Sequence, residues 1–510
     1  MRASRGRNAV VVVVGGCTAS TVFMLFQLFL VGIVTVQGWI PAQHHSCLSR
    51  RRPEPYLWRT SLSASNTKLR ELYPPMNQLS NGTLQVDDIH TLFYAIYGEE
   101  TDDTKPKLNA LFLHGGPGAG CFPNHARFFD PAHYNVVLLD QRGCGLSTPR
   151  GEARNNTLQH LVNDCERIRT KLLGDSGKWD LVLGGSWGTT LAIAYGQTFP
   201  SSIRGMILRG VCLLRQAEID WLFSETGGAA NLVPQAWEQF EAGANLTEEE
   251  SKSDDPRAVL HRYYDRLWGT DVQDRQAAAQ SWSRYEFLIS SSHKLPPSLN
   301  ISDQNATRAA LFSGQNETYV PGSVAVRESS LSEHEGKWIY RDAWGRQRSI
   351  QELNAASEEY LSNRLVQHIF DNTLPTMDQK VSKAFEPRPV PSWSEAHVAE
   401  ESQSNTTQNI PAQNMLTSFY SANERFVKDG ADLLDQERMD RLRTILCVAI
   451  HGGQDRICPP DTAFELAENW PELELRVPLR SGHSMYDPAI THELVQATDK
   501  FASFFRSQAS

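Results

Sequence analysis

The segment Leu181–Gly196, which reads LVLGGSWGTTLAIAYG, constrains the fold more than any other part of the sequence. The run Trp179–Leu183 is short and aliphatic, as in a buried parallel strand, and Thr189–Phe199 has the apolar spacing of a helix. Ser186 therefore lies at a strand-to-helix turn. The neighbouring glycines remove Cβ atoms that would collide there, so the G-x-S-x-G pattern predicts a strained, exposed serine at the carboxyl end of a strand.

Apolar runs alternate with amphipathic segments on both sides of this turn. They predict strands at Leu84–Tyr97 (a hairpin), Leu111–Leu113, Val136–Leu139, Met206–Leu208, Ile445–Ile450 and Glu472–Val477, and helices at Leu158–Leu172, Thr462–Glu468 and Ile490–Phe505. Strands that alternate with helices imply an α/β domain whose mostly parallel central sheet has helices on both faces.

The alternation is interrupted in the middle of the chain. Residues 216–440 are helical in pattern and rich in tryptophan, which predicts a helical lid, or cap, inserted between core parts 72–215 and 441–510. Two polar stretches inside the cap, near 296–349 and 385–413, are rich in Pro, Gly, Ser and Asn. Such composition predicts surface loops or disorder.

The amino-terminal segment has the pattern of a targeting signal. Three arginines precede a region without charged side chains, so residues 1–40 are expected to be a signal peptide or a membrane anchor, with attachment possible through residues 9–40. Residues 41–71 form a basic, Ser/Arg-rich linker or transit-like segment. The expected location is the secretory pathway or a membrane, with a plastid reached through a two-part signal as the alternative. Seven N-x-[ST] sequons are compatible with secretory passage.

The composition excludes several classes of function. A formal net charge of -10 disfavours nonspecific nucleic-acid binding. The eight cysteines are scattered, without a CxxC pair or a His/Cys spacing that would hold zinc. The sequence therefore predicts no metal and no cofactor, and leaves disulfide pairing and oligomeric state open.

Two further residues complete a pattern typical of acyl transfer, which needs a nucleophile, a base, an orienting carboxylate and donors for the oxyanion. The strand Ile445–Ile450 is followed by HGGQDRICPP, which places Asp455 at its carboxyl end. The strand after it is followed by PLRSGHSMYDP, which places His483 likewise. Each residue alone has a plain structural explanation, but the chain order Ser186, Asp455, His483 at successive strand ends is that of α/β-hydrolases.

Candidate donors for the oxyanion lie in a glycine-rich turn. The strand Leu111–Leu113 runs into HGGPG, whose backbone N–H groups can point at a substrate oxygen. Gly116 in this turn and Trp187, which follows the nucleophile, are the predicted oxyanion donors.

Six motifs occur along the chain in this order: LHGGPGAG, LLDQRGCGLSTP, LVLGGSWGTTLAIAYGQTFP, LRGVCLLR, HGGQDRICPP and SGHSMYDP. Together, from about Leu72 to Phe505, they resemble the prolyl aminopeptidases (proline iminopeptidases), serine peptidases of α/β-hydrolase fold. The resemblance implies removal of an N-terminal residue, typically proline, from peptides with a free N-terminus, through an acyl-enzyme on Ser186 with His483 as base and Asp455 as orienting acid.

The resemblance also implies acids in the lid that bind the substrate's amine, because a buried ammonium needs a paired anion. SWSRYEFL is similar to the family's lid segment and makes Glu286 a candidate for that acid. Arg215 and Glu225 match family positions at the start of the lid and are further candidates for substrate binding.

One family position departs from the pattern. The segment RLVQHIF has Val366 where the family's second lid acid usually lies. Glu358 or Glu359 could substitute, the alignment could slip beside the insertion, or specificity could have drifted. An esterase or amidase of small acyl groups on the same fold therefore stays as an alternative. A membrane-tethered binding protein with a retired hydrolase fold is the third hypothesis.

Overall fold

Two compact units divide the chain, Met1–Arg52 and Pro53–Ser510, and the described residues all belong to the second. The computed structural model describes residues 69–100, 106–291, 411–423, 433–470 and 472–508, and the backbone of short strands within 59–60 and 324–349. The leader expected at 1–40, most of segment 41–71, and Glu358, Glu359 and Val366 lie outside these ranges. Within them, no helix combines the length and apolarity needed to cross a bilayer.

A mixed sheet forms the centre of the second unit, as the alternation of strands and helices predicts. The strand order is β1-β8-β13-β12-β7-β6-β4-β5-β3-β2 among the described strands. The pairs from β5 through β4, β6, β7 and β12 to β13 are parallel, whereas β2 and β3 join one edge and β8 and β1 the other in antiparallel fashion. The strands of this sheet are β1 Arg59–Thr60, β2 Asn77–Gln85, β3 Thr91–Gly98, β4 Leu108–Leu113, β5 Tyr134–Asp140, β6 Trp179–Gly185, β7 Ile203–Arg209, β8 Val324–Arg327, β12 Leu446–Ile450 and β13 Glu474–Pro478.

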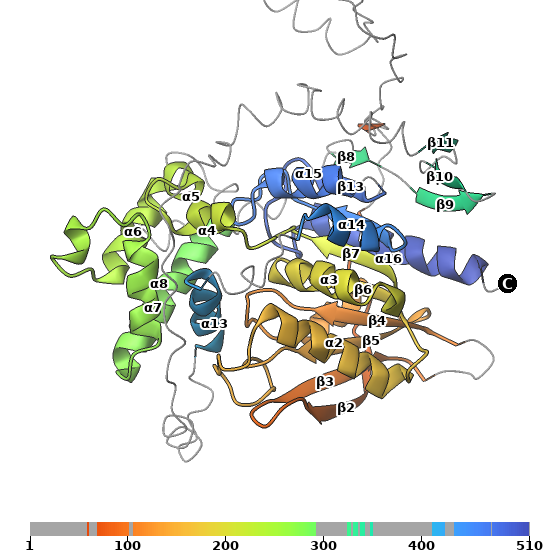
Figure 1. The fold of residues 1–510 in the computed structure, drawn as a ribbon, viewed down its shortest axis with the longest axis horizontal. Helices are drawn as coiled ribbons and strands as arrows, with labels where there is room; N and C mark the ends of the chain where they lie inside the picture. Colours follow the sequence, from red (N-terminus) through yellow and green to blue (C-terminus); the bar gives the residue numbers. More distant parts are fainter. Residues whose placement is uncertain are drawn as a thin grey trace, which may run out of the picture. The chain divides into compact units, whose positions relative to one another are not determined.

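Both faces of the sheet are buried, because alternate side chains of each strand enter different cores. In β4, Leu111 and Leu113 pack into one hydrophobic cluster and Ala110 and Phe112 into another. Helices α2 Leu158–Leu173 and α3 Trp187–Thr198 belong to the first cluster, and α16 Pro488–Ser507 belongs to the second. Figure 1 shows the helices stacked on the twisted strands.

The helices α14 Gln436–Leu442 and α15 Pro460–Asn469 complete the core. The predicted boundary between cap and core at 440/441 falls inside α14. This helix contacts α3, and Leu433 just before it accepts a hydrogen bond from Gln197 of α3. The return to the core therefore begins before residue 441.

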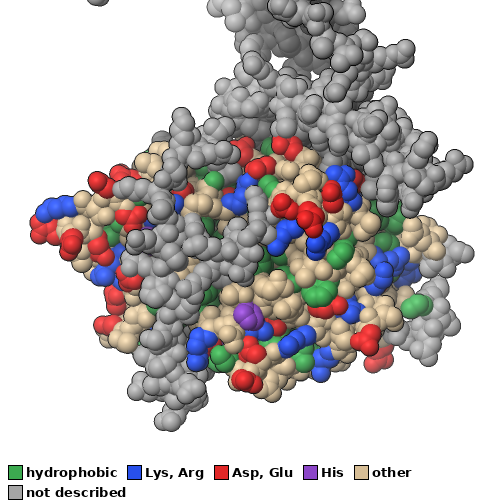
Figure 2. All heavy atoms as spheres, viewed as in Figure 1, with side chains coloured by type: hydrophobic (Ala, Val, Ile, Leu, Met, Phe, Trp, Pro, Cys, Tyr) green, Lys and Arg blue, Asp and Glu red, His purple; other side chains and the backbone are tan. Residues whose placement is uncertain are grey.

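The cap is a helical layer that buries packed aromatic rings, and these rings belong to the same hydrophobic cluster as one face of the sheet. Around Phe240, the rings of Tyr285 and Tyr263 stack at centroid distances of 4.1 and 4.3 Å, and Trp282 meets the same ring edge-on at 5.6 Å. Asp and Glu side chains are scattered over its outer surface (Figure 2). The cap is thus apolar inside and polar outside. Its helices are α4 Gln216–Phe223, α5 Gly228–Leu232, α6 Pro234–Ala244, α7 Ala258–Leu267, α8 Val272–Ser291 and α13 Ala412–Ser421.

The polar stretch near 296–349, expected to be loop or disorder, contains strands. One of them, β8, adds to the edge of the main sheet beside β13. The others form a small antiparallel sheet, β9 Ser330–His334, β10 Lys337–Arg341 and β11 Gln347–Ser349. The expectation of loops was wrong at these positions, because short β-prone runs such as Val324–Val326 were outweighed by polar neighbours when the composition was averaged.

We expect Phe240→Ala to destabilise the protein by about 3–5 kcal/mol, because it removes a buried ring and leaves a cavity among aromatic partners. Phe287→Ala is the matched control, since Phe287 lies on the same cap with 53% of its surface exposed. The control should change the free energy of unfolding by less than about 0.5 kcal/mol. Urea denaturation measures both values, and equal effects would contradict the packing of these aromatic rings in the cap.

Candidate active site

Ser186 lies at the tight turn between β6 and α3 with backbone angles of φ 54° and ψ −124°. A non-glycine residue with positive φ is strained and persists only where the surroundings hold it. The Ser186 N–H donates to the carbonyl of Arg209 at 2.8 Å, which ties the turn to β7. A Cβ atom at Gly188 would overlap the carbonyl oxygen of Leu113, so the second glycine of the motif lets α3 approach β4.

The structure brings the three predicted triad residues together. His483 Nε2 lies 3.1 Å from Ser186 Oγ, and His483 Nδ1 lies 2.7 Å from Asp455 Oδ2. Asp455 is fully buried, and its Oδ1 accepts backbone N–H groups from Ile457 and Cys458, each at 3.0 Å. Burial by itself would raise the pKa of Asp455, but His483 and these donors hold that pKa below its ordinary value. The carboxylate therefore stays ionised and orients the imidazole.

A second histidine, which the sequence analysis missed, lies behind the triad. His451 Nδ1 accepts the Val211 N–H at 3.0 Å, and its Nε2 donates to the Cys458 carbonyl at 2.9 Å. Burial lowers the pKa of His451, so the ring is neutral beside Asp455, 3.7 Å away. His451 thus holds together the loops that follow β7 and β12 without competing for the charge of Asp455.

A buried arginine also contacts His483. Arg209 ends β7, and its Nη1 donates to the His483 carbonyl at 2.9 Å and lies 3.4 Å from Nε2. Burial lowers the pKa of Arg209. The contact fixes the backbone of the loop that carries His483. In the sequence, the one sign of this role is a charged residue directly after the apolar run Met206–Leu208.

The predicted oxyanion donors flank the nucleophile. A Cβ atom at Gly115 would lie 3.1 Å from the Ser186 Cβ, so the HGGPG turn passes directly against the serine. Gly116 has φ 114°, a conformation that favours glycine. Trp187 is the first residue of α3, where the helix dipole favours negative charge. The HGGPG turn and the first residue of α3 therefore both lie beside Ser186, and the roles of Gly116 and Trp187 as oxyanion donors stay predictions.

A cap helix covers this turn. The Thr417 hydroxyl of α13 donates to the Pro117 carbonyl at 3.1 Å, and the Tyr420 ring meets the Trp187 ring edge-on at 4.6 Å. The same helix contacts α8, where Asn414 donates to Ser283 at 3.0 Å. Residues 385–413 were predicted to be a polar insertion, and α13, whose first two residues lie at the end of that stretch, was not predicted. The contacts that give α13 its place come from residues far apart in the chain.

The DQRG motif, used above as a family signature, anchors the core beside this turn. Arg142 makes two hydrogen bonds to Asp164 of α2, at 2.6 and 2.7 Å, and one to Asp87 at 2.5 Å. Asp140 accepts the backbone N–H groups of Cys121 and Leu146, each at 2.7 Å. The loop after β5 is therefore pinned by charge-assisted hydrogen bonds.

Glu286, the predicted amine ligand, lies on α8 of the cap. Its Oε1 accepts the indole N–H of Trp282 at 2.8 Å. Burial raises the pKa of Glu286 to about 7, against the opposing effect of that hydrogen bond. Among the described residues, no ion pair joins Glu286 to a cation. By surface area Glu286 is only partly buried, and its role as the ligand of the substrate's amine stays a prediction.

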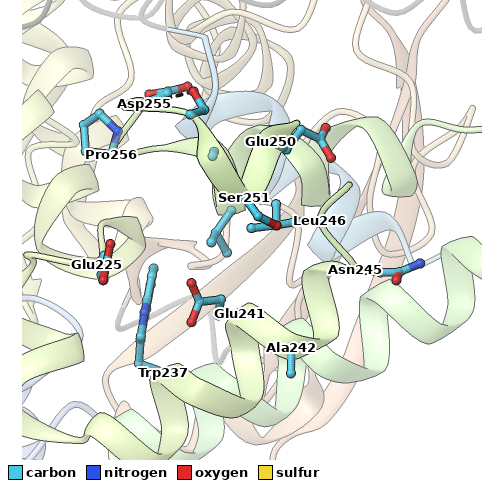
Figure 3. Close-up of a pocket in the computed structure, with 13 residues that line it drawn as sticks. Glu225, Trp237, Glu241, Ala242, Asn245, Leu246, Glu250, Ser251, Asp255 and Pro256 are labelled. Atoms are coloured by element: carbon cyan, nitrogen blue, oxygen red, sulfur yellow. Dashed lines mark hydrogen bonds between the residues drawn. The ribbon is translucent and has the colours of Figure 1, made fainter. Parts of the chain in front are cut away.

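The other two predicted substrate-binding residues lie elsewhere in the cap. Arg215 pairs with Glu218 at 3.1 Å and with Glu465 of α15 at 2.7 Å, which joins the start of the cap to the core. Glu225 is exposed and lines an open cavity of about 390 Å³ with Trp237 and Glu241 (Figure 3). The walls of this cavity come from the cap alone. No contact of either residue with the triad is seen in the described parts, and their substrate roles stay predictions.

The comparisons with known proteins agree with the motifs. A family model of the α/β-hydrolase fold matches residues 111–288, which confirms the predicted fold class. A proline iminopeptidase of Arabidopsis thaliana is 31% identical over 84% of this chain and 82% of its own length. A proline iminopeptidase of Xanthomonas citri is 30% identical over 85% of this chain and 100% of its own length. A probable proline iminopeptidase of Leptolyngbya boryana is 30% identical over 85% of this chain and 98% of its own length.

The raised pKa of Glu286 predicts a pH-dependent effect of Glu286→Gln on stability. A carboxyl whose pKa is higher folded than unfolded binds more protons when folded, so its ionisation destabilises the fold as pH rises through about 7. The amide side chain of the Glu286→Gln variant does not ionise, so its contribution to stability does not change with pH. The variant should match the parent near pH 5 and gain stability near pH 8, measured by thermal unfolding. A constant difference between these pH values would contradict the shift.

Proposed function

Because the chain belongs to the proline iminopeptidase family of α/β-hydrolase fold, we propose that it is a serine aminopeptidase that removes N-terminal residues, preferentially proline, from peptides. One observation carries the proposal: an unbroken series of hydrogen bonds runs from the buried Asp455 through His483 to the hydroxyl of Ser186. A hydroxyl held in that way can be deprotonated at neutral pH as it attacks a carbonyl.

In the proposed reaction, Ser186 Oγ attacks the carbonyl carbon of the substrate's first residue while His483 Nε2 accepts the hydroxyl proton. The backbone N–H groups of Gly116 and Trp187 stabilise the oxyanion. Asp455 stabilises the imidazolium, which then protonates the leaving amine as the C–N bond breaks. Water, deprotonated by His483, attacks the acyl carbon. The C–O bond to Ser186 Oγ then breaks, the imidazolium returns its proton to Oγ, and the amino acid leaves.

Specificity for a free amine is proposed to come from Glu286. An ammonium beside this carboxylate would favour its ionised form, because an opposite charge lowers the pKa that burial raises. Binding of the substrate would thus supply the counter-ion that the carboxylate lacks among the described residues. A blocked N-terminus would leave the carboxylate without this partner.

We expect Ser186→Ala to lower kcat for release of a chromophore from proline 4-nitroanilide by roughly 10⁴-fold or more, because no other group supplies the nucleophile. The free energy of unfolding should change by no more than about 1.5 kcal/mol, since Ala keeps the same backbone strain and the variant loses one hydrogen bond, to His483. Steady-state kinetics and thermal unfolding test both points. Turnover of the variant near the parent's rate would rule out Ser186 as the nucleophile.

A substrate panel tests the amine requirement and separates a peptidase from an esterase. The anilides of proline, alanine and N-acetylproline are compared with a simple acyl ester, for the parent and for Glu286→Gln. The parent should prefer the free proline amide, and Glu286→Gln should raise its KM by about 10-fold or more, since a hydrogen bond to a charged group contributes about 1.5–3 kcal/mol. The ester should be unaffected. Equal turnover of blocked and free proline would contradict the role of Glu286.

A further inference from the structure

Gln141 is a buried polar residue that the reaction as described does not use. It directly follows β5, and only 4% of its surface is exposed. Its side chain joins two segments that are far apart in the sequence. The Oε1 atom accepts the indole N–H of Trp187 at 2.9 Å, and the Nε2 atom donates to the carbonyl of His114 at 2.9 Å.

These two partners belong to the two halves of the oxyanion hole. Trp187 supplies one backbone donor directly, and His114 begins the HGGPG turn in which Gly116 supplies the other. The Gln141 backbone adds a third link, because its N–H donates to His114 Nε2 at 3.2 Å. His114 Nδ1 lies 2.9 Å from the Gly115 carbonyl, to which it donates. One residue therefore holds both halves at once.

We propose that Gln141 is a positioning residue that sets the distance between the two oxyanion donors. The inference rests on the proposed function of Ser186, because an oxyanion hole has meaning only for attack on a carbonyl. Donors stabilise the transition state only when they are held about 3 Å from the oxyanion before the reaction. A displacement of about 1 Å can cost on the order of 100-fold in rate. The amine subsite around Glu286 lies on a different helix and should not depend on Gln141.

Loss of the amide would leave the Trp187 indole N–H and the His114 carbonyl without the partner they share. Such buried groups are costly to leave unsatisfied, so the two segments should shift to find other partners. Because the oxyanion forms only during the reaction, the shift should lower kcat more than it raises KM. A purely structural role would instead lower stability without this kinetic signature.

The chain contains a matched control for this distinction. Gln197 on α3 is equally buried, with 3% of its surface exposed, and its Nε2 donates to the Leu433 carbonyl at 2.7 Å. Gln197→Met and Gln141→Met each replace a buried amide by an apolar side chain of similar size. Both variants lose hydrogen bonds of the core, but only Gln141 contacts the oxyanion segments.

The experiment measures three quantities for the parent, Gln141→Met, Gln197→Met and Gln141→Glu: the melting temperature, kcat and KM for proline 4-nitroanilide, and the rate at which a fluorophosphonate labels Ser186. The phosphonyl oxygen occupies the oxyanion hole during labelling, so this rate tests the hole without a peptide substrate. We expect Gln141→Met to lower kcat and the labelling rate in parallel, by about 10-fold to 100-fold, with KM within about twofold.

Gln141→Glu keeps an acceptor for Trp187 but sets a carboxylate oxygen against the His114 carbonyl, so its kcat and its labelling rate should also fall below those of the parent. Gln197→Met should keep the kcat and labelling rate of the parent. Labelling of Gln141→Met at the parent's rate, or an equal loss in Gln197→Met, would overturn the proposal. If Gln141→Met does not fold, Gln141→Glu decides by the same comparison. A parent that is labelled but does not release proline would count against the proposed substrate and leave this test intact.

Discussion

The hydrogen bonds that join Asp455, His483 and Ser186 depend on the parallel order of β6, β7, β12 and β13. Parallel strands bring their carboxyl ends to one edge of a sheet, so residues almost 300 positions apart meet there. The arrangement needs a rigid sheet, and the two buried faces supply it. A shift of any of these strands by one residue would turn the side chains at its end away from the site.

The groups around the triad share one physical task, which is to hold loops that the strands alone would leave loose. Arg209 and His451 connect the loops after β7, β12 and β13, and the DQRG segment braces the turn that carries the oxyanion donors. These polar groups are buried and each makes hydrogen bonds to a neighbouring segment, although Arg209 Nε has no hydrogen-bond partner among the described residues. Hydrogen bonds between these loops therefore hold the residues of the site in place before a substrate binds.

The cap contributes a different kind of constraint. Its packed aromatic rings make it a stable layer, and α13 links that layer to the oxyanion turn through Thr417 and to α8 through Asn414. The helix that carries Glu286 and the turn that carries Gly116 thus share one neighbour. In the proposed reaction, amine recognition and oxyanion stabilisation would therefore come from separate elements that contact the same helix.

The sequence by itself determined the alternation of strands and helices in the core, the turn at Ser186 and the identity of the three residues that meet there, because each of these is encoded by local periodicity or by a short motif beside a strand. The strands within 324–349 and helix α13 were not predicted, because polar neighbours masked their short apolar runs. Only the tertiary structure showed which groups Gln141, Arg209 and His451 contact. The sequence around a polar residue at the end of an apolar run does not indicate which distant residue it will bond. The tertiary structure also decided that Arg215 pairs with Glu465 and that α13 covers the oxyanion turn. Such contacts join segments far apart in the chain, and their geometry arises when the layers pack.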